Sequence, residues 1–503
     1  MQGVVGEDCR RLVLTAHPLQ RVGAFALAAL VPGRRRRLLD PTGVHADEFD
    51  AVVARLTEDA AAAALVDGTK ADDGFWLKAS GSLFPNSPIN HPSRLKKSAE
   101  ERAAEVRRWR SMPDRVDWPD VACVLCGRPA CGFYGKVDVP LAESTLYRNT
   151  TPLGHAGMSL CWACLCCFYA LPYGARLTGG PSSVLHSWDE DFLAAWVSGQ
   201  AARTGRALAI GVPPEGGAMP AEVLALKGLR GYGHRMTDGV ELIVFSNNNR
   251  GQEIDSYPMT QPMAEWLRTT LRSDRHRGFD MLLRAFRTEK AAGHRRLAWA
   301  AFHRPEDLLR RGVAYACSSE WPAGISGSLA DLAAICRSLA TEVFSVNERD
   351  VAEIQTVAAH VATVIARSDR GGQVTGFRVA ATRPAQLQAL LQSMATRWLL
   401  NPDNTASTDP FVTMRQFRLL FDPDRSSWLH RQLLVVGVLE ELHRVGWLPD
   451  DGEAAEADAD SDIAEDLARM TEEIGQIDDD AAVDTDTGTD TGTENTEDEE
   501  RVR

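Results

Sequence analysis

Seven of the ten cysteines lie between Cys123 and Cys167, and their spacing predicts a metal site. Cys123-Val-Leu-Cys126-Gly127 and Cys161-Trp-Ala-Cys164 each separate two thiols by two residues. Zinc held by four thiolates is tetrahedral, and a tight turn that carries a C-x-x-C pair supplies two of the four sulfurs. Four thiolates leave no open coordination position. We therefore expect a structural Zn2+ ion bound by Cys123, Cys126, Cys161 and Cys164.

The second pair of ligands is ambiguous from spacing alone. Cys164 and Cys167 also form a C-x-x-C pair, and Cys131 and Cys166 are further thiols in the same segment. The alternative to a metal site is a group of buried free cysteines, which behave as small apolar residues. Paired spacing in a chain with few cysteines elsewhere favours metal in a reducing compartment over secreted disulfides.

Basic residues gather in three clusters that could contact phosphates. Neutralising phosphates with Lys and Arg gives binding that weakens with salt, whereas the alternative is a solvated helix face. The first cluster is Arg34–Arg37, and the third runs from Arg272 to Arg284, with Arg295 and Arg296 beyond it. From the middle cluster we predict these phosphate contacts: Arg94, Lys96, Lys97, Arg107 and Arg108.

Two asparagine-rich loops are candidates for reading DNA bases. Asn86 and Asn90 lie in a segment punctuated by prolines, and Asn247, Asn248 and Asn249 precede Arg250 at a predicted hairpin tip. Asn side chains can reach base edges in either groove. Asn is also an ordinary turn residue that tolerates positive φ, and that alternative stays open.

The charge of the chain is unevenly distributed. The net charge is −14, but residues 451–503 hold 21 Asp and Glu against three Arg, so residues 1–450 are slightly basic. A segment of this composition cannot bury apolar surface, and we expect it to be disordered. It either solubilises the protein or screens its basic surface from nonspecific DNA as a phosphate mimic.

Motifs of several large enzyme classes are missing from the sequence. We find no P-loop, no dinucleotide-binding glycine motif, no H-E-x-x-H and no G-x-S-x-G, and the histidines lack metal-ligand spacing. No apolar run approaches the roughly 20 residues of a membrane-spanning helix. No signal peptide is recognisable either. We therefore expect a cytoplasmic protein that is not an enzyme.

Periodicity predicts an α+β fold with two folded parts. Helical spacing begins at Pro18, Val240–Phe245 and Ile254–Tyr257 alternate as in a hairpin, and helical patterns dominate after Leu329. We predict a mixed N-terminal domain over residues 1–325, with a zinc-ribbon insertion at 120–175. An α-helical bundle at 326–450 and the acidic tail at 451–503 follow.

The order of several motifs resembles the large subunit of type I CRISPR Cascade interference complexes, in the zinc-containing branch of subtypes I-B and I-A. The resemblance covers residues 12–260, and only helical character agrees beyond Leu329. It rests on the following segments in this order: Thr15-Ala-His-Pro-Leu-Gln-Arg-Val-Gly23, Leu83-Phe84-Pro85-Asn86-Ser87-Pro88, the Cys123 pair, and Cys161-Trp-Ala-Cys164 leading into Ala170-Leu-Pro172-Tyr-Gly174.

The resemblance implies a non-catalytic subunit of an RNA-guided antiviral complex. Such subunits recognise the protospacer-adjacent motif of double-stranded DNA and support R-loop formation, while base pairing reads the remaining sequence. The implied partners are CRISPR RNA, target DNA, the backbone, guide-end-capping and small subunits of Cascade, and a helicase-nuclease recruited in trans. The family's cysteine pairs match Cys123, Cys126, Cys161 and Cys164, whereas its DNA-reading residues do not transfer by motif.

Two other functions remain open from the sequence. A free-standing zinc-ribbon regulator would bind DNA without guide RNA or partner subunits. A cysteine- or zinc-dependent enzyme would need a reactive thiol or a zinc ion with an open coordination position.

Overall fold

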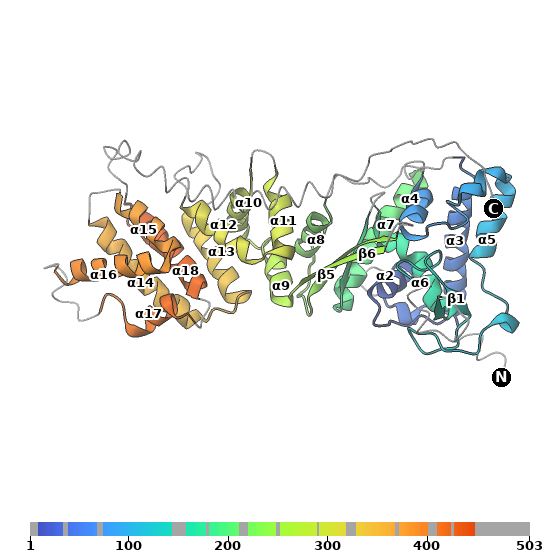
Figure 1. Ribbon diagram of the computed structural model, residues 1–503, viewed down its shortest axis with the longest axis horizontal. Coiled ribbons are helices and arrows are strands. Elements are labelled where there is room, and N and C mark those ends of the chain that lie inside the picture. The colour runs from blue at the N-terminus through green and yellow to red at the C-terminus, as the bar shows by residue number, and fades with distance from the viewer. Residues whose placement is uncertain are drawn as a thin grey trace, which may run out of the picture. The chain divides into compact units, whose positions relative to one another are not determined.

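In the computed structural model the chain forms two compact units, Met1–Asn347 and Glu348–Arg503 (Figure 1). The fold is a mixture of helices and small antiparallel sheets, in agreement with the predicted α+β class. The structure describes residues 9–33, 39–67, 74–142, 157–177, 181–210, 220–247, 252–288, 291–317, 328–367, 372–400, 410–423 and 427–447. The predicted acidic tail and the Arg34–Arg37 cluster lie outside these residues.

The first half of the N-terminal unit surrounds two closely packed helices, α2 and α6. Pro18 begins α2, where its fixed φ suits the first turn, and the predicted helices at Pro18, Asp47 and the basic segment all form. The helices here are α2 (Pro18–Ala29), α3 (Ala46–Ala64), α4 (Phe75–Leu83), α5 (Ala99–Trp109) and α6 (Trp162–Gly174). Short 3-10 helices lie at Pro41–Gly43, Pro92–Lys96 and Arg115–Asp117.

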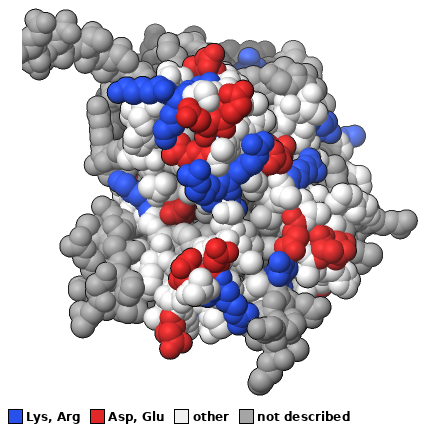
Figure 2. Space-filling model, turned by 90° about the vertical axis from the view of Figure 1, so that its right-hand side faces the viewer, with Lys and Arg blue, Asp and Glu red and all other residues white. Residues whose placement is uncertain are grey.

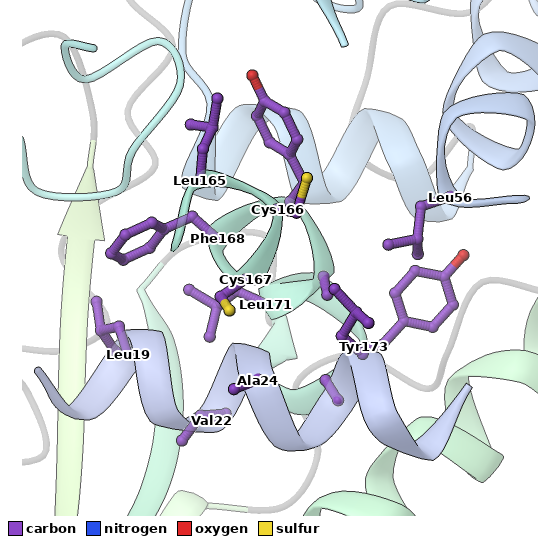
Figure 3. Close-up of a cluster of buried hydrophobic side chains, with 14 of the residues drawn as sticks. Leu19, Val22, Ala24, Leu56, Leu165, Cys166, Cys167, Phe168, Leu171 and Tyr173 are labelled. Carbon is purple, nitrogen blue, oxygen red and sulfur yellow. The ribbon is translucent and has the colours of Figure 1, made fainter. Parts of the chain in front are cut away.

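Close approach of α2 and α6 depends on a glycine. A Cβ atom at Gly23 would overlap the carbonyl oxygen of Cys167, so only glycine lets the two backbones pack at this point. Around this crossing, Leu19 and Val22 of α2 belong with Cys167 and Phe168 of α6 to one buried apolar cluster (Figure 3). Every residue of α6 is buried, which explains why its apolar residues show no one-sided pattern.

Two antiparallel sheets lie in the same unit. The small one pairs β1 (Gly132–Tyr134) with β2 (Met158–Leu160). The larger one has the order β3-β4-β5-β6, from β3 (Arg176–Leu177), β4 (Ser182–Ser187), β5 (Val240–Asn247) and β6 (Gln252–Met259). Strands β5 and β6 form the predicted hairpin, and α2 and α7 (Glu190–Ile210) pack against β4.

Helices complete both units. In the N-terminal unit they are α8 (Ala221–Arg230), α9 (Gln261–Thr269), α10 (His276–Ala285), α11 (Gly293–His303), α12 (Glu306–Ala316) and α13 (Leu329–Glu342). In the C-terminal unit they are α14 (Glu348–Ala366), α15 (Gly372–Thr382), α16 (Pro384–Leu399), α17 (Met414–Phe421) and α18 (Ser427–Arg444). Within the residues described, no helix is both long and apolar enough to cross a membrane.

The division at Asn347 differs from the predicted boundary near residue 325. Helix α13, predicted to belong to the C-terminal bundle, instead packs against α10 and α12 of the N-terminal unit. Its apolar face is equally suited to either neighbour, so periodicity alone does not decide which one it covers. In the part of the C-terminal unit that the structure describes, all regular secondary structure is helical, and α14 packs along α18.

A buried histidine in β4 makes the free energy of unfolding depend on pH. Burial, followed by the charge of Arg21, lowers the pKa of His186 to about 4, and its side chain is 1% exposed. The unfolded chain therefore binds a proton that the folded chain refuses between pH 6.5 and 4, so stability falls as pH falls through this window. We expect a loss of about 3 kcal/mol by pH 4 from this group, by the same linkage.

Urea unfolding of the full chain between pH 7 and pH 4 measures this dependence. A His186→Gln variant is the matched control, because glutamine keeps polar atoms but does not titrate. The free energy of unfolding should fall more steeply between pH 7 and pH 4 in the wild type than in the variant. Parallel curves of this free energy against pH would contradict the assignment.

Candidate metal centre

The first cysteine pair lies on a tight turn. Arg128 accepts a hydrogen bond from the backbone of Cys123 (N···O 2.6 Å), and Gly127 donates from its backbone to the carbonyl of Cys123 (2.9 Å). Gly127 has φ +76°, which a residue with a side chain adopts only at a cost. The turn is closed by an isolated antiparallel bridge between Ala122 and Pro129. Cys123 and Cys126 are thus presented together, as the C-x-x-C-G pattern predicts.

The second pair lies at the start of a helix, not on a second turn of a zinc ribbon. Strand β2 ends at Leu160, Cys161 is the N-cap residue of α6, and Cys164 lies in its first turn. Residues three apart on a helix share a face. The positive end of the helix dipole also favours a thiolate over a thiol there. The prediction of two equivalent C-x-x-C turns is therefore wrong in form, although its ligands are the ones brought together.

Backbone hydrogen bonds join the two halves of the centre. Val124 donates to the carbonyl of Ser159 (N···O 2.9 Å), and the Ser159 hydroxyl donates to the carbonyl of Ala122 (2.8 Å). Cys131 donates from its backbone to Leu160 (2.8 Å), which extends the β1–β2 pairing towards the cysteines. These contacts hold the Cys123 turn against the strand that leads into α6.

The four sulfurs form one compact group. The Sγ atoms of Cys123, Cys126, Cys161 and Cys164 all lie within 4.8 Å of one another, and Cys126 and Cys161 are 3.5 Å apart. Tetrahedral zinc with Zn–S bonds of about 2.3 Å places its sulfurs about 3.8 Å apart. All four cysteines are free of disulfides, and only Cys126 is not fully buried. The donor set and its spacing fit a structural zinc ion, with Cys123, Cys126, Cys161 and Cys164 as its four ligands.

The neighbouring cysteines have other partners, which removes the ambiguity left by spacing. Cys131 contacts the hydroxyl of Tyr134 (Sγ···Oη 3.2 Å), and burial raises its pKa to about 11. Cys167 donates to the carbonyl of Ala163 (3.2 Å) and accepts a hydrogen bond from Gln20. Cys166 is fully buried on α6, and burial raises its pKa. All three belong to the apolar core.

Electrostatics within the group favour a bound cation. The pKa of Cys123 is lowered by hydrogen bonds from the thiols of Cys126, Cys161 and Cys164, so one sulfur ionises readily. The pKa of Cys164 is raised, first by its hydrogen bond to Cys123, because a second thiolate would meet the charge of the first. A divalent cation reverses that repulsion and allows all four sulfurs to be thiolates.

Two predicted DNA contacts are wrong. Arg94 is 3% exposed and donates to the backbone carbonyls of Ile89 and Val66, so its guanidinium cannot reach a phosphate. Asn247 is fully buried at the end of β5, where its amide donates to the carbonyls of Leu83 (2.7 Å) and Lys136 (3.1 Å). Both residues stabilise the fold by satisfying backbone oxygens.

The other predicted contacts differ in their surroundings. Lys97 pairs with Glu105 (2.6 Å), and Arg107 forms two hydrogen bonds with Glu58 (2.8 Å each). The end of the molecule that carries α5 therefore shows acidic and basic side chains interspersed rather than one basic face (Figure 2). Lys96 and Arg108 are exposed. Asn248, Asn249 and Arg250 lie outside the described residues.

The asparagines of the proline-rich loop have conformational roles. Asn86 is exposed with φ +63°, the turn conformation that asparagine tolerates better than most residues. Asn90 accepts a hydrogen bond from the Ser87 hydroxyl (3.3 Å). Of the two, Asn86 is the one presented at the surface.

No protein-family model, no curated protein and no solved structure matches this chain.

Proposed function

We propose that this chain is the non-catalytic large subunit of a type I CRISPR surveillance complex, with one structural zinc ion. In this role it recognises the protospacer-adjacent motif of double-stranded DNA and supports R-loop formation in antiviral defence. The observation that carries the proposal is the convergence, in one buried core, of the separate motifs on which the family resemblance rests.

These motifs contact one another although they are far apart in the sequence. His17 caps α2 by accepting from the backbone of Gln20 (3.4 Å), and its ring packs edge-on against Phe168 of α6 (centroids 5.5 Å apart). Phe84 packs against Tyr169, also on α6 (6.4 Å). Gly174 contacts Val22 so closely that a Cβ atom would be crowded. One cooperative core explains why such segments would recur together in a family.

The metal centre supports a structural role in this proposal. Two of its residues, Cys161 and Cys164, lie at the start of α6, the helix that the other motifs surround. Zinc bound there by Cys123, Cys126, Cys161 and Cys164 would supply a rigid cross-link between the β1–β2 segment and α6. Because thiolates occupy all four positions, the ion would add folding free energy and no reactive site.

Co-purification tests the proposal most directly. The tagged chain, expressed with its neighbouring genes, should retain repeat-derived RNA and several copies of a backbone protein, as sequencing and mass spectrometry would show. A lone protein that binds DNA with zinc and without RNA would favour the free-standing regulator. Turnover abolished by thiol alkylation in a folded chain would favour the enzyme.

Duplex binding tests the remaining surface cations. We expect Arg108→Ala, combined with Lys96→Ala, to weaken all duplexes alike. The slope of log K against log salt should fall by about 0.9 for each phosphate that the variant no longer neutralises. Arg107→Ala is the matched control one residue away, because Glu58 already holds that guanidinium. Fluorescence anisotropy over a salt series measures the affinities. If Arg107→Ala weakens duplex binding as much as the double variant does, the assignment is contradicted.

A further inference from the structure

A groove lies between α7 and α8, in the N-terminal unit and apart from the metal centre. Its volume is about 780 Å³, within the range of ligand-binding clefts. The helices run antiparallel, because Phe192 at the start of α7 contacts Tyr232 after the end of α8 (5.2 Å), while Trp196 lies against Gly228 one turn further along. None of the residues predicted from the sequence to bind DNA lines it.

Small residues create the floor of the groove. Ala195 and Gly199 on α7, Gly228 on α8 and Gly231 directly after α8 all line the groove. A Cβ atom at Gly228 would overlap the ring of Trp196, so glycine is required for this ring to lie against α8. The indole is half-buried and is therefore held in place while part of it faces the groove.

Aromatic rings continue from Trp196 towards one end. Tyr232 packs edge-on against Phe192 and against His234 (5.7 Å), and His234 is exposed. Aromatic faces held in this way are stacking platforms for nucleic-acid bases, and stacking tolerates any base.

Basic and acidic residues lie at different positions along the groove. Lys227 is exposed beside Gly228, and the guanidinium of Arg203 lies 5.9 Å from the Trp196 ring while hydrogen-bonding Gln200. Asp191 lies at the opposite end. Asp191 and Arg203 are twelve residues apart on α7, which is about 18 Å along a helix. This length exceeds one nucleotide, and cations flank the central ring.

From these observations we propose that the α7–α8 groove binds single-stranded nucleic acid. Bases stack on Trp196 and on the exposed His234, which the buried Tyr232 supports, and backbone phosphates contact Lys227 and Arg203. The proposal rests on the groove alone, and it holds whether or not the chain belongs to a CRISPR complex.

Anisotropy of a labelled oligothymidylate with the full chain tests the proposal. We expect Trp196→Leu to weaken binding about tenfold, the effect of removing one stacked base, and Trp196→Phe to retain most of it. Lys227→Glu should weaken binding and lower the salt slope by about 0.7 for one phosphate. Lys227 is exposed, so this variant tests the groove without disturbing the core.

Matched variants outside the groove complete the design. Arg206→Glu changes an exposed arginine on the same helix that does not line the groove, and Trp299→Leu removes another half-buried tryptophan. Both should bind like the wild type. The proposal is overturned if these controls weaken binding as much as the groove variants do, or if thymidine monophosphate competes as well as the oligonucleotide. If the wild-type chain binds the single strand in a Trp196-dependent way but does not recognise a duplex, the result counts against the proposed function and leaves the groove proposal standing.

Discussion

Cys161→Ser should abolish zinc binding and unfold the metal-centred part of the N-terminal unit. Structural zinc contributes roughly 10–16 kcal/mol of apparent binding free energy, whereas whole domains are stable by only about 5–15 kcal/mol. Removal of one ligand also leaves three thiols without their fourth partner, of which Cys123 ionises readily. We expect at most a trace of bound zinc by elemental analysis. Near-ultraviolet circular dichroism should show loss of the tertiary signal from the tryptophans of this unit.

Cys131→Ser is the matched control, because Cys131 is 1% exposed in the same segment but contacts Tyr134 instead of the sulfur group. It should retain one zinc per chain and be destabilised by about 1–3 kcal/mol, the cost of an imperfectly satisfied buried hydroxyl. Equal zinc loss in both variants would mean that the ligand set is wrong. A Cys161→Ser protein with wild-type zinc content and melting temperature would rule out the centre altogether.

Arg110→Ala should destabilise the N-terminal unit by about 3–5 kcal/mol, the cost of truncating a large buried side chain. Arg110 is 2% exposed, and burial lowers its pKa to about 10, so it remains charged at neutral pH. Four aromatic rings surround its guanidinium with centroids 4.3–5.3 Å away: Trp76, Phe84, Trp109 and Tyr169. Alanine removes these cation–π interactions and leaves a cavity between the rings.

Arg110→Met separates the charge from the volume. Burial costs the guanidinium its hydration, and in the described structure Nε and Nη2 have no hydrogen-bond partner. Methionine fills the space without that penalty, so it should recover more than half of the stability that alanine removes. Recovery should be incomplete, because Asp138, held by Trp109 (2.7 Å), is then without its nearby positive charge. Chemical denaturation measures all three proteins, and equal stability of the methionine and alanine variants would contradict this account.

Much of the local structure was predictable from the sequence. The start of α2 at Pro18, the β5–β6 hairpin and the long C-terminal helices follow from proline geometry and from hydrophobic periods of two and 3.6 residues. The Cys123–Cys126 turn followed in the same way, since C-x-x-C-G with a glycine at positive φ is a local pattern. These features depend only on residues that are near neighbours in the chain.

Side-chain partners from distant segments were not predictable. Arg107 pairs with Glu58 and Arg94 donates to Val66, and neither partner can be inferred from the basic cluster in which these arginines lie. Asn247 lies at the end of a strand and not in its loop, and its partners Leu83 and Lys136 come from two other segments. A charged or polar residue is available to a ligand only if the fold has not already satisfied it.

The sequence by itself predicted a metal-binding group of cysteines, because thiols in paired spacing are typical ligands of soft cations such as zinc. It also determined the helical and strand periods and the separation of acidic and basic charge. Only the tertiary structure decided that Cys161 and Cys164, rather than Cys167, join the first pair. Helix α6 turns Cys164 towards the Cys123 turn, and it packs Cys167 against Gln20 of α2. The position of a residue around a helix decides its contacts only when the segments packed against that helix are known.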